Sequence, residues 1–489
     1  MSSLSILIVA PLLLFAFIAT LVGIWRITWA YRAAVLGLAL SLVAASVGIF
    51  RVLSEGELHH YLGGWPPPFG IEYVLDHLSA FIVLIVVFIG LIAVIYPPEA
   101  GLYQTPRKGV PVYGLILLLF AGLAGVVVTG DLFNLFVFLE IYSLASYALI
   151  TLGGDRAVVA SFRYLVLGTI AGSFFLLGVG FIYFSTGTLN MADAAQRLPP
   201  LYDSPTIMAA AALIVIGMGI KMALFPLHVW LPDAHSYASP VIAAILAAIQ
   251  IEVAAYVLVR MLLTVFQPQY FIEVLPVTTV IGWTAAAGII FGSVMAIAQK
   301  DFKRMLAYST VAQVAYIGLG IGLANPLGLI GGLLHILNHA FMKSCLFLVA
   351  GGIRYQTGLY KISQFAGLGR RMPLMMAAFT VAALSMVGIP PTCGFFSKWY
   401  LVLGSIDANN WVFVAVILVS SLLTAVYFFR VIEKIYAIPS SGDHAVEQAT
   451  EPSARILVPI LILAVGVIVL GLINAVIVTQ VLKPVVALL

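Results

Sequence analysis

The sequence predicts an all-α membrane protein that crosses the bilayer about fourteen times. Three observations carry this prediction: 63% of the residues are hydrophobic, only 9% are charged, and the mean hydropathy is +1.14. A chain of this composition is too apolar for a soluble protein, and its 489 residues are too many for one or two spans. The composition therefore indicates a polytopic membrane protein.

Apolar runs of about 20 residues, each long enough to span a bilayer, follow one another along the chain. Polar or Gly/Pro-rich segments separate them, for example 55–69 and 439–453. The first run has no basic region before it and no cleavage site after it, so we expect a retained helix and not a signal peptide. The expected spans are 4–24, 33–53, 75–96, 111–129, 132–152, 161–184, 207–229, 239–264, 275–298, 306–324, 327–350, 374–404, 411–435 and 456–481.

The basic residues predict the orientation, because Lys and Arg gather in the cytoplasmic loops of membrane proteins. Of the 23 basic residues, four fall in loops on one side (Arg51, Arg197, Arg260, Lys483) and three within spans (Lys221, Lys343, Lys398). Both termini are therefore expected outside. The other sixteen fall in the alternate loops: Arg26, Arg32, Arg107, Lys108, Arg156, Arg163, Lys300, Lys303, Arg304, Arg354, Lys361, Arg370, Arg371, Arg430, Lys434 and Arg455.

Titratable residues inside the spans are the candidates for function. The stretch 218–236 reads MGIKMALFPLHVWLPDAHS, with Lys221 inside an apolar run. A charge near the bilayer centre costs at least about 2.5 to 3.5 kcal/mol, so Lys221 is expected to face protein or water. Pro226 removes a backbone donor, and we expect the helix to break there beside a hydrated cavity.

Glu140 lies well inside the fifth span and has the charge that complements Lys221. In a low dielectric the ionisation of each partner changes the pKa of the other, which suits a unit that handles protons. A static ion pair that fixes two helices is the alternative. Asp131, near the membrane edge, is expected to cap a helix.

The eleventh span carries His335, His339 and Lys343 in the segment HILNHAFMKSCLF. Their spacing of four residues places them on one helix face over about 12 Å. Histidine and a buried lysine can both exchange protons, so the spacing predicts a proton relay. A metal site is less favoured because the HExxH glutamate is missing.

The twelfth span pairs a break at Pro390 and Pro391 with Lys398. The seventh span combines lysine and proline in the reverse order. Two interrupted helices in corresponding halves indicate inverted repeats with sites near the midplane. We expect spans four to eight and nine to thirteen to form two inverted five-helix repeats. The expected segments are 1–110, with helices one to three, 111–265 and 266–436, the repeats, and 437–489, a cytoplasmic loop and the last helix.

The sequence predicts no cofactor. Its two cysteines, Cys345 and Cys393, both lie in apolar runs, and no iron–sulfur cluster motif, GxGxxG or P-loop occurs. Energy for transport is therefore expected from partner subunits or from an ion gradient.

Six stretches carry a resemblance to a known family: TGDLFNLFVFLEIYSLASYALI, STGTLNMADAA, GIKMALFPLHVWLPDAHSYASPV, KDFKRMLAYSTVAQVAYIGLG, HILNHAFMKSCLF and GIPPTCGFFSKWY. They resemble the antiporter-like subunits of Mrp cation/proton antiporters, membrane-bound hydrogenases and respiratory complex I, and the Mrp antiporter protein of type D is the most similar. The resemblance implies a subunit that translocates protons, with Na⁺ as a second candidate ion, in the cytoplasmic membrane of a prokaryote. Other antiporter-like membrane subunits are the implied partners, and the alternative is a hydrogenase or complex I-like oxidoreductase.

The family pattern implies a row of titratable side chains halfway through the bilayer. At the eighth-span position where the family has a lysine, this sequence has Glu252, which could relay protons, bind a cation or interrupt the row. The implied row is Glu140, Lys221, Glu252, His335, His339, Lys343 and Lys398.

The family also has a cytoplasmic access route near the end of span seven, where this sequence has His228, Asp233 and His235. Helix capping and loop hydrogen bonds are the alternative role for these three. Two other protein classes stay open. A solitary solute transporter should show a pocket of convergent aromatics, and a membrane-embedded enzyme would need a nucleophile or a metal set.

Overall fold

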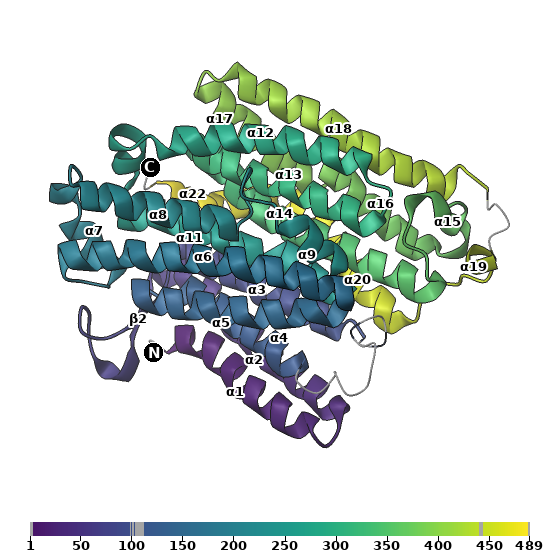
Figure 1. Ribbon diagram of the computed structural model, residues 1–489, viewed down its shortest axis with the longest axis horizontal. Coiled ribbons are helices and arrows are strands. Elements are labelled where there is room, and N and C mark those ends of the chain that lie inside the picture. Colours follow the sequence, from purple (N-terminus) through teal and green to yellow (C-terminus); the bar gives the residue numbers. More distant parts are fainter. Residues whose placement is uncertain (1–2, 98, 100–101, 103–111, 440–443, 488–489) are drawn as a thin grey trace.

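The computed structural model describes residues 3–97, 99, 102, 112–439 and 444–487, and within these ranges long helices run side by side (Figure 1). Eleven of the described helices are long and apolar enough to cross a membrane, and four shorter apolar helices accompany them. Both chain termini lie at the same end of the bundle. Arg107 and Lys108, two of the sixteen basic loop residues, lie outside the described residues.

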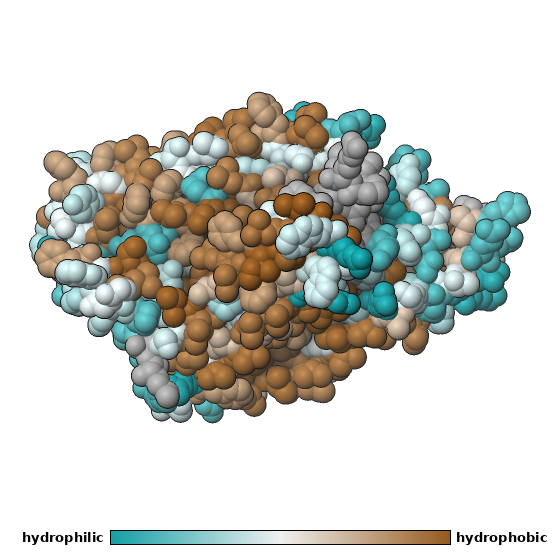
Figure 2. Space-filling model, turned by 90° about the horizontal axis from the view of Figure 1, so that it is seen from below, coloured by the Kyte–Doolittle hydropathy of each residue, from teal (hydrophilic) through white to brown (hydrophobic). Residues whose placement is uncertain are grey.

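Apolar side chains cover the middle of the bundle on the face that Figure 2 shows. Figure 2 shows hydrophobic residues in a broad band around the middle and hydrophilic residues toward the two ends. Large apolar side chains are exposed on three different helices, where Phe17, Phe162 and Leu422 are 67%, 65% and 70% exposed. Apolar surface on this scale is stable only against lipid or a partner protein. The prediction of an α-helical polytopic membrane protein is confirmed.

The N-terminal part contains three long helices and a small hairpin in the segment expected to be a polar break. The hairpin strands pair antiparallel, with Leu58 opposite Leu75 and Tyr61 opposite Glu72. The elements are α1 (Leu4–Gly23), α2 (Ile27–Glu55), β1 (Leu58–Tyr61), η1 (Leu62–Gly64), β2 (Glu72–Leu75) and α3 (His77–Ile95).

The middle of the chain holds expected spans four to eight. Its elements are α4 (Val112–Val128), α5 (Leu132–Ile150), η4 (Thr151–Gly153), α6 (Asp155–Thr186), α7 (Met191–Arg197), η5 (Pro199–Leu201), α8 (Pro205–Lys221), α9 (Leu231–Tyr237), α10 (Pro240–Ile245), the π-helix η6 (Leu246–Gln250), α11 (Ile251–Arg260) and the π-helix η7 (Met261–Val265).

The remaining elements hold expected spans nine to fourteen. They are η8 (Tyr270–Val274), α12 (Val277–Ala298), α13 (Phe302–Gly322), α14 (Pro326–Thr357), η9 (Ile362–Gln364), α15 (Leu368–Arg371), α16 (Pro373–Val387), α17 (Cys393–Asp407), α18 (Trp411–Tyr436), α19 (His444–Glu447), α20 (Ala454–Leu472), α21 (Asn474–Ile477), η10 (Val478–Leu482) and α22 (Lys483–Val486).

Two helices are interrupted, as expected, but the first ends earlier than the sequence suggested. We expected the helix that carries Lys221 to break at Pro226, yet α8 ends at Lys221 itself. Ala223 has a positive φ of 57°, which ends the helical hydrogen bonding before the proline is reached. The second interruption is where it was expected: α16 ends at Val387, and α17 begins at Cys393 after the two prolines.

An ion pair between the buried Arg260 and the partly buried Asp76 joins α3 to the eighth span. Arg260 donates to both carboxylate oxygens of Asp76, at 2.5 and 2.9 Å. Asp76 also caps α3 by accepting from the backbone N–H of Ser79 at 2.8 Å. Burial opposes ionisation of Asp76, but the Arg260 guanidinium and the Ser79 hydrogen bonds outweigh it and hold its pKa well below its ordinary value.

The core follows two helices whose most apolar, membrane-spanning segments are completely buried. These are α14 and the continuous helix from Pro240 to Val265. α14 packs against α10, α13, α16, α17 and α20. A helix with no lipid-facing side can carry polar residues at every face, provided that its neighbours satisfy them.

Candidate functional site

The first candidate group joins α5 to the end of α8. Lys221 is 1% exposed, and its Nζ lies 3.7 Å from Glu140 Oε1. The same Nζ donates to Ser143 Oγ at 2.6 Å, one turn beyond Glu140 on α5. The Tyr142 ring centroid is 5.7 Å from Nζ. The two predicted partners are therefore together, with a hydroxyl as a closer neighbour of the ammonium than the carboxylate.

The carboxylate of Glu140 fits into space that a glycine leaves open. Its side chain is 28% exposed. A Cβ added to Gly172 of α6 would lie 2.3 Å from Glu140 Oε1, which no real contact allows. Gly172 therefore determines where this carboxylate can sit relative to Lys221.

Hydroxyl and amide groups continue inward from Lys221. Ser146 donates to the carbonyl of Ser143 at 2.7 Å, and Gln250 Nε2 donates to Ser146 Oγ at 3.4 Å. Gln250 also donates to the hydroxyl of Tyr164. It is the last residue of π-helix η6, two residues before Glu252. π-helical turns are frequent at functional sites because the wider turn redirects side chains.

Glu252 contacts His339, so the glutamate at this position has a titratable partner on α14. Glu252 Oε1 is hydrogen-bonded to His339 Nδ1. The two residues are 2% and 0% exposed. Glu252 Oε2 and His339 Nε2 have no hydrogen-bond partner among the described residues. A titratable pair therefore stands where the family pattern has a lysine, with one free polar atom on each partner.

His335 lies one turn before His339 on α14 and has partners at both ring nitrogens. Nδ1 is 2.9 Å from Ser397 Oγ of α17, and Nε2 is 3.0 Å from Gln313 Oε1 of α13. The two imidazole centroids are 6.1 Å apart, with planes inclined by 18°. The histidines are thus stacked along one helix face, as their spacing predicted.

Lys343 occupies the next turn of the same face. It is 0% exposed, and its Nζ donates to the carbonyl of Leu306 at 2.8 Å and to Ser309 Oγ, both on α13. No carboxylate pairs with it among the described residues. Its ammonium is held by neutral oxygens alone, an arrangement that suits a group that gives up its proton.

Lys398 ends the row at the second interrupted helix. Its Nζ donates to the last carbonyls of α16, Met386 O at 2.9 Å and Val387 O at 3.1 Å, and to Ser421 Oγ at 3.2 Å. It also lies 5.0 Å from the ring centroid of Tyr316. The helix break therefore exposes carbonyls that hold the terminal lysine.

The three residues expected at a cytoplasmic access route are separated. Asp233 pairs with Arg163 at 2.9 Å and with Arg304 at 3.3 Å. His228 packs between aromatic rings, 5.4 Å from Phe225 and 5.0 Å from Phe291. His235 is fully buried on α9, and neither ring nitrogen has a partner among the described residues. These three residues therefore do not form one cluster, and their access role stays a prediction.

Sequence reasoning missed the neutral polar residues that connect the titratable ones. They form no motif, but each stands out as a buried polar side chain within an otherwise apolar span. Four of them are hydrogen-bonded directly to members of the row: Ser143, Ser309, Gln313 and Ser397. Three others bond to one another and to Ser143: Ser146, Tyr164 and Gln250.

The arrangement suits proton transfer more than metal chemistry. The described residues contain no group of three His, Cys, Asp or Glu side chains that could hold a metal ion. Instead, acids, imidazoles, lysines and hydroxyls follow one another across α5, α8, α11, α14 and α17. Each can donate or accept a proton or relay one through a neighbour or a water molecule.

Comparison with known proteins shows which families and relatives the chain is similar to. A family described as "NADH:quinone oxidoreductase/Mrp antiporter, TM" matches residues 129–424. The N-type membrane protein of the NADH-quinone oxidoreductase of Desulforudis audaxviator is 53% identical over 468 residues, 92% of each chain. The D-type protein of the Na⁺/H⁺ antiporter of Alkalihalophilus pseudofirmus is 33% identical over 441 residues, 90% of this chain and 87% of that one.

A solved structure shares the whole architecture. A chain of the membrane-bound sulfane sulfur reductase, described as an archaeal respiratory membrane complex, superposes with a TM-score of 0.90 at 32% identity, over 99% of this chain and 97% of that one. The resemblance expected from the sequence is confirmed. The chain belongs to the NADH:quinone oxidoreductase/Mrp antiporter family of membrane subunits.

Proposed function

We propose that this chain is a proton-translocating, antiporter-like subunit of a multisubunit membrane complex. One observation carries the proposal: a row of titratable side chains, all of them buried except the partly exposed Glu140, runs from Glu140 and Lys221, through Glu252 and His339, to Lys398. Burying so many titratable groups in a membrane is expensive. Such a cost is expected where the groups carry out transport.

The Glu140 and Lys221 pair is the proposed control point. Lys221 Nζ is 2.6 Å from Ser143 Oγ but 3.7 Å from Glu140 Oε1, so a small movement of the carboxylate changes its attraction for the ammonium. When a movement in a neighbouring protein of the complex pulls Glu140 away, the proton on Lys221 is held less tightly and passes inward. When Glu140 returns, Lys221 takes up a proton again.

Two parent complexes fit. The 33% identical relative is named as part of a Na⁺/H⁺ antiporter, which supports an Mrp-type antiporter with H⁺ and Na⁺ as the ions. The 53% identical relative is named as part of NADH-quinone oxidoreductase, which supports a redox-driven complex. We propose the same task for this chain in either complex, because every titratable group of the row can donate or accept a proton.

We infer further that residues 111–265 and 266–436 are two inverted repeats, flanked by 1–110 and 437–489. The interrupted helices at Lys221 and near Lys398 support this division, since each places a buried lysine beside a helix break. We also place the chain in the cytoplasmic membrane of a prokaryote with both termini outside. The shared end of the two termini and the distribution of basic residues support this orientation.

Proton translocation by the intact complex tests the proposal. Inverted membrane vesicles that contain the complex are energised, and acidification of the lumen is followed with a fluorescent amine. We expect Glu140→Ala and Lys221→Ala each to abolish translocation while native gels show a complex of normal size. Exposed residues supply the controls Glu433→Gln and Lys483→Ala, which are expected to leave the rate unchanged. Full activity in either site variant would reject the assigned roles.

A further inference from the structure

An apolar groove runs along the exposed side of α20, between this helix and α3. It has a volume of about 800 Å³. Phe88 of α3 and Phe341 of α14 line it together with six positions of α20, from Val458 to Val469. No lining residue is polar, and on α20 Val458, Val465 and Val469 are 48%, 57% and 44% exposed. The groove therefore suits an apolar occupant.

Phe341 is the most buried residue of the groove and lies on the helix that carries the histidines of the row. Its ring stacks on that of Phe88, with centroids 5.4 Å apart and planes inclined by 18°. Gly466 of α20 leaves room for this ring, since a Cβ there would lie 2.6 Å from Phe341 Cε1. At 3.6 residues per turn, Phe341 faces about 200° away from His339, two residues earlier. An occupant of the groove would therefore pack against the back of α14.

The length of the groove matches one leaflet of a bilayer. The eleven residue steps from Val458 to Val469 correspond to about 16 Å along the helix axis. The hydrocarbon core is about 30 Å thick, so one leaflet accounts for about 15 Å of it. A transmembrane helix of a partner protein would need about twice the length of this groove to be covered along its whole span. The depth corresponds instead to one acyl chain.

Arg455 stands at the polar end of the groove. α20 begins at Ala454, at the end of the bundle opposite the chain termini, called here the basic end because it carries the basic loops (Figure 1). Arg455 is exposed and lies three residues before Val458, on the helix face that lines the groove. The nearest carboxylate along the chain, Glu451, accepts from the backbone N–H of Leu374 at 2.6 Å.

No carboxylate of the described residues forms an ion pair with Arg455. A guanidinium group binds phosphate through two parallel hydrogen bonds. The basic residues at this end of the bundle also favour a ligand with net negative charge over a zwitterion, by about fivefold in affinity for each Lys or Arg near the membrane surface. The charge next to the groove therefore complements an anionic lipid headgroup.

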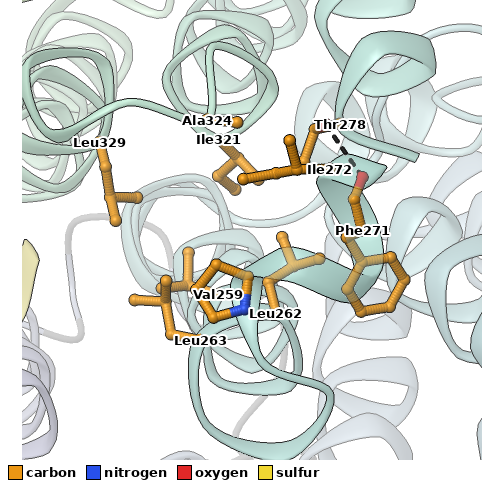
Figure 3. Close-up of a pocket in the computed structure, with 10 residues that line it drawn as sticks. Val259, Leu262, Leu263, Phe271, Ile272, Thr278, Ile321, Ala324 and Leu329 are labelled. Carbon is orange, nitrogen blue, oxygen red and sulfur yellow. Dashed lines mark hydrogen bonds between the residues drawn. The ribbon is translucent and has the colours of Figure 1, made fainter. Parts of the chain in front are cut away.

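A second pocket shows that an apolar lining alone does not select a phospholipid. The pocket in Figure 3, of about 340 Å³, is lined by Val259, Leu262, Leu263 and other largely apolar side chains. Its one marked hydrogen bond runs from Thr278 Oγ1 to Phe271 O at 3.2 Å. None of its lining residues is charged, so a headgroup would find no opposite charge there.

We propose that the groove on α20 binds one phospholipid with an anionic headgroup from the leaflet at the basic end. Arg455 pairs with the phosphate, and one acyl chain lies along α20 over Phe341. This inference goes beyond the proposed proton translocation and does not depend on it.

Native mass spectrometry of the purified complex tests the proposal. The complex is stripped of lipid in detergent and titrated with phosphatidylglycerol or with phosphatidylcholine of the same chain length. Val465→Trp fills the groove with an indole ring, and we expect it to remove one tightly bound phosphatidylglycerol. Val426 on α18 is 53% exposed and does not line the groove, so Val426→Trp should keep the wild-type number. The wild-type number in Val465→Trp, or the same loss in Val426→Trp, would overturn the proposal.

Arg455→Gln tests the headgroup contact separately, because it removes the charge and leaves the groove open. We expect phosphatidylglycerol to occupy the site about fivefold more tightly than phosphatidylcholine in the wild type, and equally tightly in Arg455→Gln. The equally exposed Arg371 supplies the control Arg371→Gln, which should keep the preference. A preference that survives in Arg455→Gln, or that is lost in Arg371→Gln as well, would overturn the pairing with Arg455.

The alternative occupants are a helix of a partner protein and a second copy of this chain. Either would be displaced by the indole ring, so Val465→Trp would then give a smaller complex on native gels and an unchanged number of bound lipids. That result would overturn the proposal. A complex of normal size with one phosphatidylglycerol fewer is the result that we expect.

Discussion

Replacing Glu252 by glutamine should separate the proton-carrying role of this residue from its structural role. Glu252 Oε1 is hydrogen-bonded to His339 Nδ1, and both side chains are almost fully buried. A glutamine amide can either donate to or accept from the ring nitrogen, so the contact survives in either imidazole tautomer. We expect Glu252→Gln to change stability by less than about 1 kcal/mol, the size of a typical hydrogen bond.

Glu252→Ala should behave differently. It removes the partner of His339 Nδ1, and His339 Nε2 already lacks one among the described residues. A buried polar group left unpaired costs about 1 to 3 kcal/mol. The alanine variant should therefore lower the apparent melting temperature of the purified complex, whereas the glutamine variant should not. Both variants remove the titratable group, so both should lose translocation by about 10²-fold or more, the range seen when a proton-transfer group is removed.

The assay is vesicle acidification combined with a thermal unfolding scan of the same preparations, with Glu433→Gln as the surface control. A glutamine variant that pumps at the normal rate would refute the reasoning, because a side chain that holds no exchangeable acid proton would then suffice.

Glu252→Lys is a further variant to measure in the same assay. The titratable neighbours of His339 besides Glu252 are Lys343, His335 and His235, none of them acidic, so an added ammonium should be poorly tolerated. Recovery of normal pumping with lysine would instead show an ordinary relay position.

Two further predictions concern position and stability. Gly172→Ala places a Cβ 2.3 Å from Glu140 Oε1, so the carboxylate must move and translocation should fall severalfold in an intact complex, measured by vesicle acidification. Asp76→Asn keeps the helix cap but breaks the ion pair with Arg260, which should destabilise the complex by about 3 kcal/mol in denaturant or thermal unfolding. Because the native pKa of Asp76 is lowered, the contribution of the pair is complete above about pH 4 and is lost only as the pH falls through that lowered value. The stability gap between wild type and variant should therefore be constant from pH 5 to pH 8.

Each of these predictions has a control on the same chain. Gly180 lies on the same helix as Gly172 with open space around its Cβ position, so Gly180→Ala should leave translocation unchanged. A normal rate in Gly172→Ala would show that the position of Glu140 is not critical. Asp203 is exposed, and Asp203→Asn should not affect stability. If Asp76→Asn is no less stable than this control, the ion pair does not contribute to the fold.

The sequence was most informative where it placed a costly residue in an apolar span. Lys221 and Glu140 were identified as partners from their charges and depth, and the structure brings them to 3.7 Å. The stacking of His335 and His339 followed from helical periodicity alone. These predictions depend on local rules: the cost of burying charge and the 3.6-residue turn.

What the sequence could not predict depends on contacts between distant segments. Glu252 and His339 are 87 residues apart, and nothing in either helix indicates that the other faces it. The π-helical turn that ends at Gln250 has no composition signal, because its residues are ordinary helix formers. The early end of α8 arises from the conformation of Ala223, a residue with no preference for a positive φ. Packing between helices decides all three.

The reversed charge at Glu252 becomes understandable when its neighbours in the row are considered. Lys343 is hydrogen-bonded to α13, and His339, one turn away on α14, faces Glu252. A lysine at position 252 would bring a second ammonium toward Lys343 and a protonatable imidazole, in a buried region where a low dielectric strengthens the repulsion between them. A carboxyl group there can instead balance a proton that arrives from Lys343, and then release the proton toward Gln250 and Lys221. The acid at position 252 therefore suits a part of the row whose other titratable groups, His335, His339 and Lys343, can all become positively charged.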